Sequence, residues 1–231
     1  MDLSRYDVVI APVLYMLQPG FARKIEAFVE RGGTFITTFM SGIVDQNDLV
    51  TLGGYPGELR KLLGIWVEET DALFPDMRNE VVIESPPPGL EALTGRYEAR
   101  LICDVLHPEG AEVIGRFGTD FYAGSPALTR HRFGNGWAWY VATAPDGLLL
   151  ERLVAHIAQS HGIEPVAQAP AGVEVTRRVK GGTGYTFYLN HNQEDVEIDL
   201  GDEDRLELLS MRRLSRRVLL PARGVMIVQD A

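Results

Sequence analysis

The sequence has 231 residues and a mass of 25.6 kDa, and its 22 basic and 32 acidic residues give a net charge of −10. This balance excludes the basic surface that nucleic-acid binding requires, and no apolar run approaches the roughly 18 residues of a membrane span. The single cysteine, Cys103, excludes an internal disulfide framework and a thiolate metal cluster, and it favours a reducing compartment.

The first forty residues predict a strand, a helix and a second strand. Residues 7–12 are a short apolar run, residues 21–29 carry apolar side chains at helical spacing, and residues 34–39 are β-branched and aromatic. Gly32-Gly33 ends the helix. Because a strand–helix–strand unit makes a right-handed crossover, we expect a parallel sheet covered by helices.

A shaped loop is predicted over residues 41–57, because a polar stretch is followed by three glycines and a proline at residues 53–57. A short helix over residues 58–63 then ends at Gly64, and a strand follows at residues 65–68.

Shorter, alternating strands are predicted from residue 80 onward. The segments 129–133 and 137–141 flank Gly134-Asn135-Gly136, which is a hairpin signal. A helix over residues 145–160, capped by Gly162, closes the first domain. The remaining strands of this part are expected at residues 80–84, 97–105 and 111–117.

A proline, alanine and glycine linker over residues 165–172 separates the first domain, residues 1–165, from a second, residues 172–231. The second domain shows only strand patterns and predicts a small antiparallel sandwich, near the lower size limit for independent stability. Its strands are expected at residues 173–178, 185–190, 196–200, 218–221 and 224–228.

No self-contained active site is predicted. Ser41 follows a strand, yet no glycine precedes it as a nucleophile elbow requires, so a turn serine is the simpler interpretation. Cys103 lies within a strand pattern, where a buried residue is expected. The five histidines show no metal-ligand spacing, and residues 53–57 lack the lysine and threonine of a nucleotide loop. We therefore predict no catalytic, cofactor-binding or metal-binding residue.

Several segments resemble glycoside hydrolase family 42 β-galactosidases over essentially the whole chain. Tyr-Asp-Val-Val-Ile-Ala-Pro at residues 6–12, Ser-Gly-Ile-Val-Asp-Gln-Asn-Asp-Leu-Val at 41–50 and Leu-Gly-Gly-Tyr-Pro-Gly at 52–57 are similar to the family's trimerisation domain. Residues 28–34, 62–65 and 134–143 continue this likeness. Residues 173–178 and 187–191 resemble, more weakly, its small C-terminal β domain.

The resemblance implies a flavodoxin-like domain (the layout of class I glutamine amidotransferases) shortened at its N-terminus, followed by an antiparallel β domain. In this family a (β/α)8 barrel carries both catalytic glutamates, and no position here corresponds to it. The resemblance therefore implies a non-catalytic assembly and accessory portion of an enzyme that hydrolyses terminal β-D-galactosides. It also implies a homotrimer that meets substrate only through the barrel, with no cofactor.

The long loop is the candidate inter-subunit contact near the barrel mouth, because it is long, rich in glycine and carries three polar groups that look fixed. A loop that packs only on its own domain is the equally weighted alternative. The candidate residues are Ser41, Gly42, Asp45, Asn47, Asp48, Gly53, Gly54, Tyr55, Pro56 and Gly57.

Two other interpretations stay open. An amidotransferase-like enzyme would need a cysteine at the elbow, where residues 39–42 read Phe-Met-Ser-Gly. A sugar-binding module would need open aromatic platforms, for which Trp66, Trp137, Trp139 and Tyr140 are candidates, although core packing suits their strand patterns better. No signal peptide is predicted after Met1-Asp2, so we expect a cytoplasmic protein that binds neither nucleic acid nor membrane.

Overall fold

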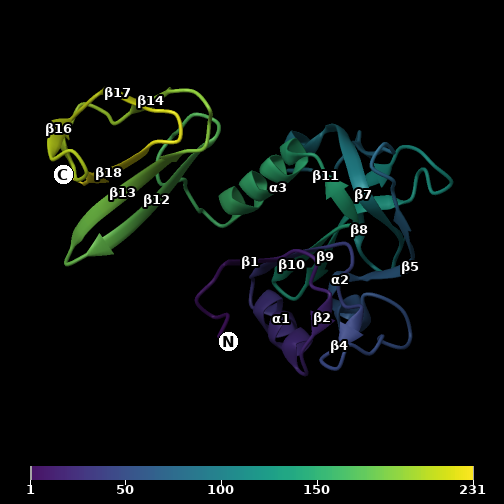
Figure 1. Ribbon diagram of the computed structural model, residues 1–231. Coiled ribbons are helices and arrows are strands. Elements are labelled where there is room, and N and C mark those ends of the chain that lie inside the picture. Colours follow the sequence, from purple (N-terminus) through teal and green to yellow (C-terminus); the bar gives the residue numbers. More distant parts are fainter. Residues whose placement is uncertain (1, 231) are drawn as a thin grey trace. The chain divides into compact units, whose positions relative to one another are not determined.

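The computed structural model describes residues 2–230. The chain divides into two compact units, with the division between Ile163 and Glu164 (Figure 1). In the described part, no helix is long and apolar enough to cross a membrane.

The first unit is built on a nine-stranded mixed sheet in the order β1-β3-β10-β9-β8-β6-β7-β11, with β5 also paired to β7. β1, β3 and β10 run parallel, and the other pairs are antiparallel. The mixed sheet confirms the coarse α/β prediction, while the finer flavodoxin-like assignment stays a prediction. The strands are β1 (Val8–Ala11), β3 (Thr34–Thr38), β5 (Ile65–Ala72), β6 (Asn79–Ile83), β7 (Gly95–Pro108), β8 (Glu112–Phe117), β9 (Pro126–Phe133), β10 (Gly136–Val141) and β11 (Thr143–Pro145).

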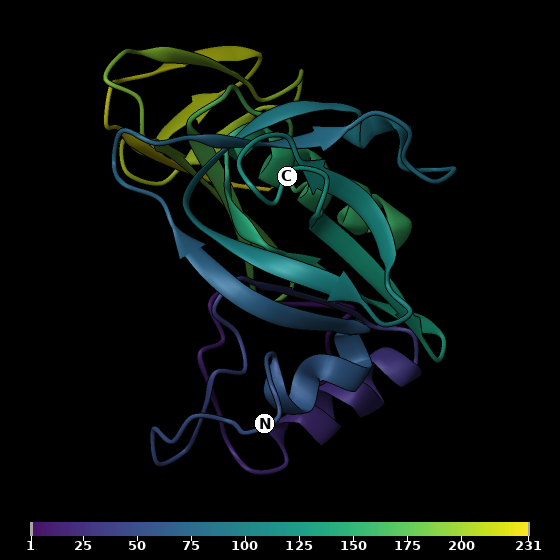
Figure 2. The ribbon, with the colours of Figure 1, turned by 90° about the vertical axis from the view of Figure 1, so that its right-hand side faces the viewer.

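The predicted strand–helix–strand unit is present as β1, α1 (Phe21–Glu30) and β3. α1 buries Ile25, Phe28 and Val29 against the sheet, as its apolar spacing requires. Gly33 lies shortly beyond α1, and a Cβ there would lie 2.3 Å from the Phe28 ring, so glycine permits the close approach with which the chain turns back into β3. In this unit α1 and α2 (Arg60–Leu63) lie on one side of the sheet and α3 (Gly147–Ser160) on the other (Figures 1 and 2).

Some of the shortest elements were not predicted from the sequence. β2 (Met16–Leu17) and β4 (Val44–Asp45) form a two-residue parallel pair, which is too short to show a periodicity. The helical turn η2 (Glu91–Leu93) was not predicted either, whereas η1 (Gly57–Leu59) and α2 together form the short helix predicted over residues 58–63. β7 is longer than predicted, because it pairs with β5 towards its end and with β6 and β11 towards its start.

In the second unit, every element of regular secondary structure that the structure describes up to residue 230 is a strand. Its five-stranded sheet has the order β12-β13-β18-β15-β16, and β14 pairs with β17 in a second, two-stranded sheet. Tyr188, Met226 and Val228 of the larger sheet share one buried cluster with Ile198 and Leu220 of the smaller one, as in a small sandwich. The strands are β12 (Val173–Lys180), β13 (Thr183–Asn190), β14 (Val196–Asp199), β15 (Arg205–Glu207), β16 (Arg212–Leu214), β17 (Arg217–Leu220) and β18 (Val225–Gln229).

Candidate functional site

The candidate loop begins where β3 ends and lies against the segment that follows β1. The Gly42 N–H donates to the Leu14 carbonyl at 2.8 Å, and the Ile43 N–H donates to the Tyr15 carbonyl at 2.9 Å. β4 in the loop then pairs in parallel with β2 in the neighbouring segment. Two connections at the carboxyl ends of adjacent parallel strands therefore form one surface, as is usual for the functional edge of an α/β sheet.

Ser41 is a buried structural residue with 0% exposure. Its hydroxyl donates to the Thr38 carbonyl at 2.7 Å, accepts from the Leu14 N–H at 3.0 Å, and lies 2.7 Å from the Thr37 hydroxyl. Because this side chain is fully buried and its hydroxyl is hydrogen-bonded within the turn, the hydroxyl is not accessible as a nucleophile. Ser41 joins the two connections to the end of β3.

The two ends of the loop meet at a backbone contact. A Cβ on Gly42 would lie 2.1 Å from the Pro56 carbonyl oxygen, and a Cβ on Gly57 would lie 2.8 Å from the Gly42 oxygen. Both glycines have positive φ, +67° and +56°. The structure thus brings Ser41, Gly42, Pro56 and Gly57 together at the base of the loop.

The middle of the loop folds around Asp45. One oxygen of its carboxylate accepts from the Asn47 N–H at 2.8 Å and from the Leu49 N–H at 3.1 Å. The Asp48 N–H donates to the Asp45 carbonyl at 3.1 Å, and Asp48 takes a left-handed φ of 62°. Of the three predicted polar groups, Asp45 shapes the tip through its side chain, whereas Asn47 and Asp48 serve through their backbone.

The other end of the loop packs on Trp66. A Cβ on Gly54 would lie 2.5 Å from the Trp66 indole nitrogen, and the Tyr55 carbonyl accepts from the Val67 N–H at 3.0 Å. Gly53 is held through its carbonyl by Arg60 at 3.2 Å. Arg60 also forms an ion pair with Glu109, whose carboxylate raises the pKa of Arg60.

Exposed apolar side chains at the tip are the feature that the sequence patterns missed. Leu49 and Leu52 are 63% and 94% exposed, and Val50 is also exposed. Buried Val44 pairs with Met16 on one side and with Val50 on the other, so the fold brings the tip next to the segment after β1. Several exposed apolar side chains on one loop are typical of an interaction surface.

The aromatic side chains considered as sugar platforms are buried or already pack against other side chains of this chain. Trp66 stacks on His107 with ring centroids 4.8 Å apart, and Arg130 lies 4.3 Å from the Trp137 ring centre. Trp139 and Tyr140 are buried. Stacking on a sugar needs an open ring face, so nothing here favours the sugar-binding interpretation.

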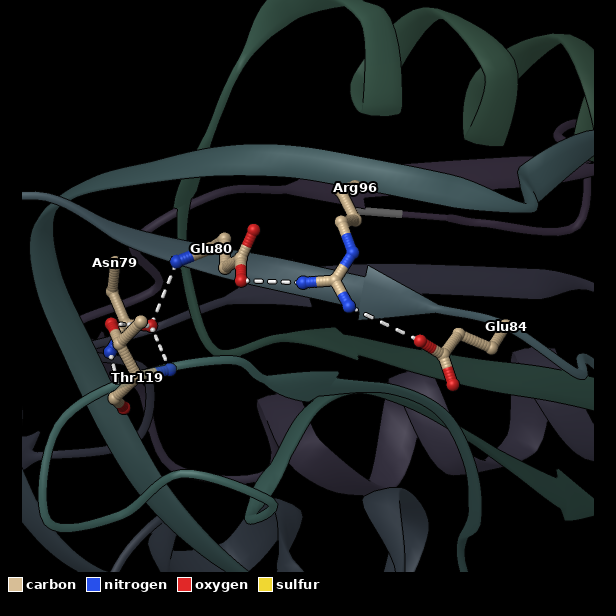
Figure 3. A network of polar contacts seen from close by, with 5 residues as sticks. All are labelled: Asn79, Glu80, Glu84, Arg96 and Thr119. Carbon is tan, nitrogen blue, oxygen red and sulfur yellow. Dashed lines mark hydrogen bonds and ion pairs between the residues drawn. The ribbon is translucent and has the colours of Figure 1, made fainter.

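A polar network joins β6 and β7 to the turn after β8. Figure 3 shows Arg96 between Glu80 and Glu84, at 2.8 and 3.3 Å. Asn79 accepts from the Thr119 N–H at 3.1 Å and from its hydroxyl at 2.9 Å (Figure 3). Because both carboxylates bind one guanidinium, they form an exposed ion-pair cluster and not an acid–base pair facing a substrate.

The remaining reactive side chains have structural partners. Cys103 is buried, and burial raises the pKa of its thiol, which keeps it unreactive. His131 contacts the Leu62 carbonyl at 2.9 Å, and His161 contacts the Thr34 hydroxyl at 2.8 Å. Among residues 2–230 no three His, Cys, Asp or Glu side chains are placed to hold a metal ion.

Comparison with known proteins gives two family matches. The model described as the β-galactosidase trimerisation domain matches residues 1–164, and the model described as the β-galactosidase C-terminal domain matches residues 172–230.

Curated relatives align with nearly the whole of this chain. A β-galactosidase of Planococcus sp. (strain L4) is 54% identical over 227 residues, which cover 98% of this chain and 33% of that protein. A β-galactosidase of Clostridium perfringens is 39% identical over 230 residues, covering 99% and 33%. The crystal structure of the β-galactosidase from Bacillus circulans sp. alkalophilus matches with a TM-score of 0.89 and 51% identity, covering 100% of this chain and 34% of that one. The chain spans about a third of the length of the curated relatives it matches.

Proposed function

This chain belongs to the glycoside hydrolase family 42 β-galactosidases, where it matches the trimerisation and C-terminal domains, and from this membership we propose that it is the assembly and accessory portion of such an enzyme. In the proposal the complete enzyme hydrolyses terminal β-D-galactosides, and these residues supply subunit contacts without touching the reacting atoms. The match of both domain models over almost all residues carries the proposal.

The contact between subunits is proposed to involve the loop over residues 41–57. Its base is fixed by Ser41, Gly42, Pro56 and Gly57, and its tip exposes Leu49, Val50 and Leu52. A rigid base lowers the entropy lost on association, and apolar side chains supply the free energy when they are buried. The candidate residues Asp45, Asn47, Asp48, Gly53, Gly54 and Tyr55 would then act by shaping the loop.

We propose a homotrimer, as the name of the matched domain model implies for its family.

Three finer points belong to the same proposal. The parallel strands β1, β3 and β10 with α1 and α3 support a flavodoxin-like origin for this part of the first unit. The functional division is placed at residues 1–165 and 172–231. The single buried cysteine suits a cytoplasmic protein.

The amidotransferase-like alternative has no support, because the hydroxyl of Ser41 is engaged in structural hydrogen bonds.

Two measurements on the purified chain test this function. Sedimentation at tens of micromolar should show a self-associated species, and an aryl β-galactoside should not be hydrolysed above the buffer rate. A clean monomer would contradict the assembly role, because the exposed patch would then have no partner copy. Measurable turnover would contradict the non-catalytic role. The two results are independent, so each part of the proposal stands or fails alone.

A further inference from the structure

Asp104 on β7 is a buried carboxylate without a charged partner among its hydrogen bonds. It is 1% exposed. One oxygen accepts from the Thr70 hydroxyl at 2.6 Å, and the other accepts from the Tyr140 hydroxyl at 2.5 Å and from the Met40 N–H at 3.3 Å. Burying an ionised group is costly unless donors surround it, so these three donors explain how Asp104 is tolerated.

The donors bring four segments to one carboxylate. Thr70 comes from β5, Tyr140 from β10, and Met40 from the turn after β3, while Asp104 itself lies on β7. Met40 has a φ of 55°, in the left-handed region that is unfavourable for a residue with a side chain. Such a conformation persists only where surrounding groups hold it, and Asp104 holds the N–H of this residue.

The next residue, Ser41, is fixed through its side chain. Its hydroxyl accepts from the Leu14 N–H at 3.0 Å, in the segment after β1, and donates to the Thr38 carbonyl at 2.7 Å. Burial and the neighbouring Asp104 carboxylate raise the pKa of Tyr140 far above its ordinary value, so its hydroxyl stays protonated and donates to Asp104. Met40 and Ser41 form the entrance to the loop.

We propose that Asp104 and Tyr140 are positioning residues: Asp104 holds the left-handed residue Met40, Tyr140 holds the Asp104 carboxylate, and together they aim the 41–57 loop. The turn is anchored to β7 and β10, so the direction in which the loop leaves β3 is set by the antiparallel part of the sheet. The claim that this loop contacts a neighbouring subunit rests on the proposed function. The claim that Asp104 anchors the loop does not depend on the proposed function.

The chemistry of the site offers a conservative variant. In Asp104→Asn the amide oxygen can accept from Tyr140 and Met40, and the amide nitrogen can donate to the Thr70 hydroxyl, which also accepts. Asp104→Ala leaves all three donors without an acceptor. If Asp104 anchors the loop, Asp104→Asn should therefore keep the protection of the loop amides that Asp104→Ala loses.

Hydrogen exchange of the backbone amides tests the anchoring. In Asp104→Ala, amides of residues 41–57 should exchange at least about tenfold faster, because hydrogen bonds to a charged group are lost at the loop entrance. Asp104→Asn should stay close to the wild type. Asp71→Asn is the matched control, since Asp71 on β5 accepts from Tyr122 at 2.9 Å away from the loop. Tyr140→Phe, which should also speed exchange in the loop, replaces Asp104→Ala if that variant does not fold.

Unchanged exchange at residues 41–57, or acceleration spread evenly over the first unit, would overturn the anchoring. Sedimentation of the same variants separates the two proposals. Weaker self-association in Asp104→Ala than in Asp71→Asn is expected. If the wild type is a monomer, the assembly role fails, yet the exchange result still decides the anchoring.

The pH dependence of stability is a separate expectation for Asp104. Burial raises the pKa of Asp104, while the hydrogen bonds from Thr70, Tyr140 and Met40 oppose this rise. The folded chain then binds the proton at a higher pH than the unfolded chain. The contribution of Asp104 to stability should therefore increase as pH falls from neutral through the raised pKa, and level off below the ordinary value of about 3.9.

Thermal unfolding of wild type and Asp104→Asn between about pH 7 and about pH 4 measures this contribution. The wild-type midpoint should rise relative to the variant as pH falls. The titratable side chains that interact with Asp104 are Tyr140 on β10 and Cys103 on β7, and both are shared by the two proteins. Parallel curves would show that Asp104 does not titrate with the expected sign.

Discussion

Replacing Leu49 and Leu52 together with aspartate should weaken self-association of this chain about 100-fold and leave each folded unit intact. Each exposed leucine contributes about 1.5–3 kcal/mol when it becomes fully buried, and a carboxylate in its place adds a desolvation cost. A loss of about 1.4 kcal/mol per position already corresponds to tenfold. Sedimentation equilibrium over a range of concentrations gives the dissociation constants.

Leu209→Asp is the matched control for this experiment. Leu209 is 63% exposed, as is Leu49, but it lies in the second unit. Substitutions at such surface positions change stability by about 0.5 kcal/mol or less, so all variants should melt close to the wild type. If the leucine pair at the loop and the control reduce association equally, the loop is not the contact surface.

Gly42→Ala should destabilise the first unit by about 3 kcal/mol and lower its melting temperature by roughly 6–12 °C. The new Cβ would lie 2.1 Å from the Pro56 oxygen and 2.6 Å from its carbonyl carbon, both backbone atoms that cannot rotate away. Overpacking costs about 1–3 kcal/mol, and the φ of +67° adds about 1–2 kcal/mol for a residue with a Cβ. Calorimetry follows the transition.

Gly20→Ala separates the cost of the Cβ contact with Pro56 from the cost of placing a residue with a side chain at positive φ. Gly20 has a nearly equal φ of +75°, but a Cβ there meets no atom within 4 Å. This variant should lose only the conformational part, about 1–2 kcal/mol. Equal destabilisation by the two substitutions would mean that the Pro56 contact does not close the loop.

Local patterns were sufficient for most elements of the fold. Apolar spacing placed α1 and α3, and Gly134-Asn135-Gly136 placed the hairpin of β9 and β10. These elements are specified by periods of 3.6 and 2 and by turn residues, which are properties of neighbours in sequence. The pairing of β7 with three strands, and the parallel pair of β2 with β4, depend on residues far apart and left no local pattern.

The composition of residues 41–57 located the candidate loop, but it did not show which of these residues are exposed and which hold the loop in place. The polar tip residues drew attention in the sequence, whereas the exposed apolar side chains Leu49 and Leu52 show their importance only once burial is known. The contact between Gly42 and Pro56 spans the whole loop, and Asp104 lies far along the chain from Met40. No spacing rule connects such residues.

By itself the sequence determined the acidic charge, the two-part organisation, the main helices and strands, and the family likeness carried by residues 41–50 and 52–57. All of these follow from residue types and short spacings. Tertiary structure alone decided that the hydroxyl of Ser41 is engaged, that Leu49, Val50 and Leu52 face outward, and that Asp104 holds the loop entrance. The reason is physical: burial and hydrogen-bond partnership are properties of the folded chain, since they arise when segments distant in sequence meet.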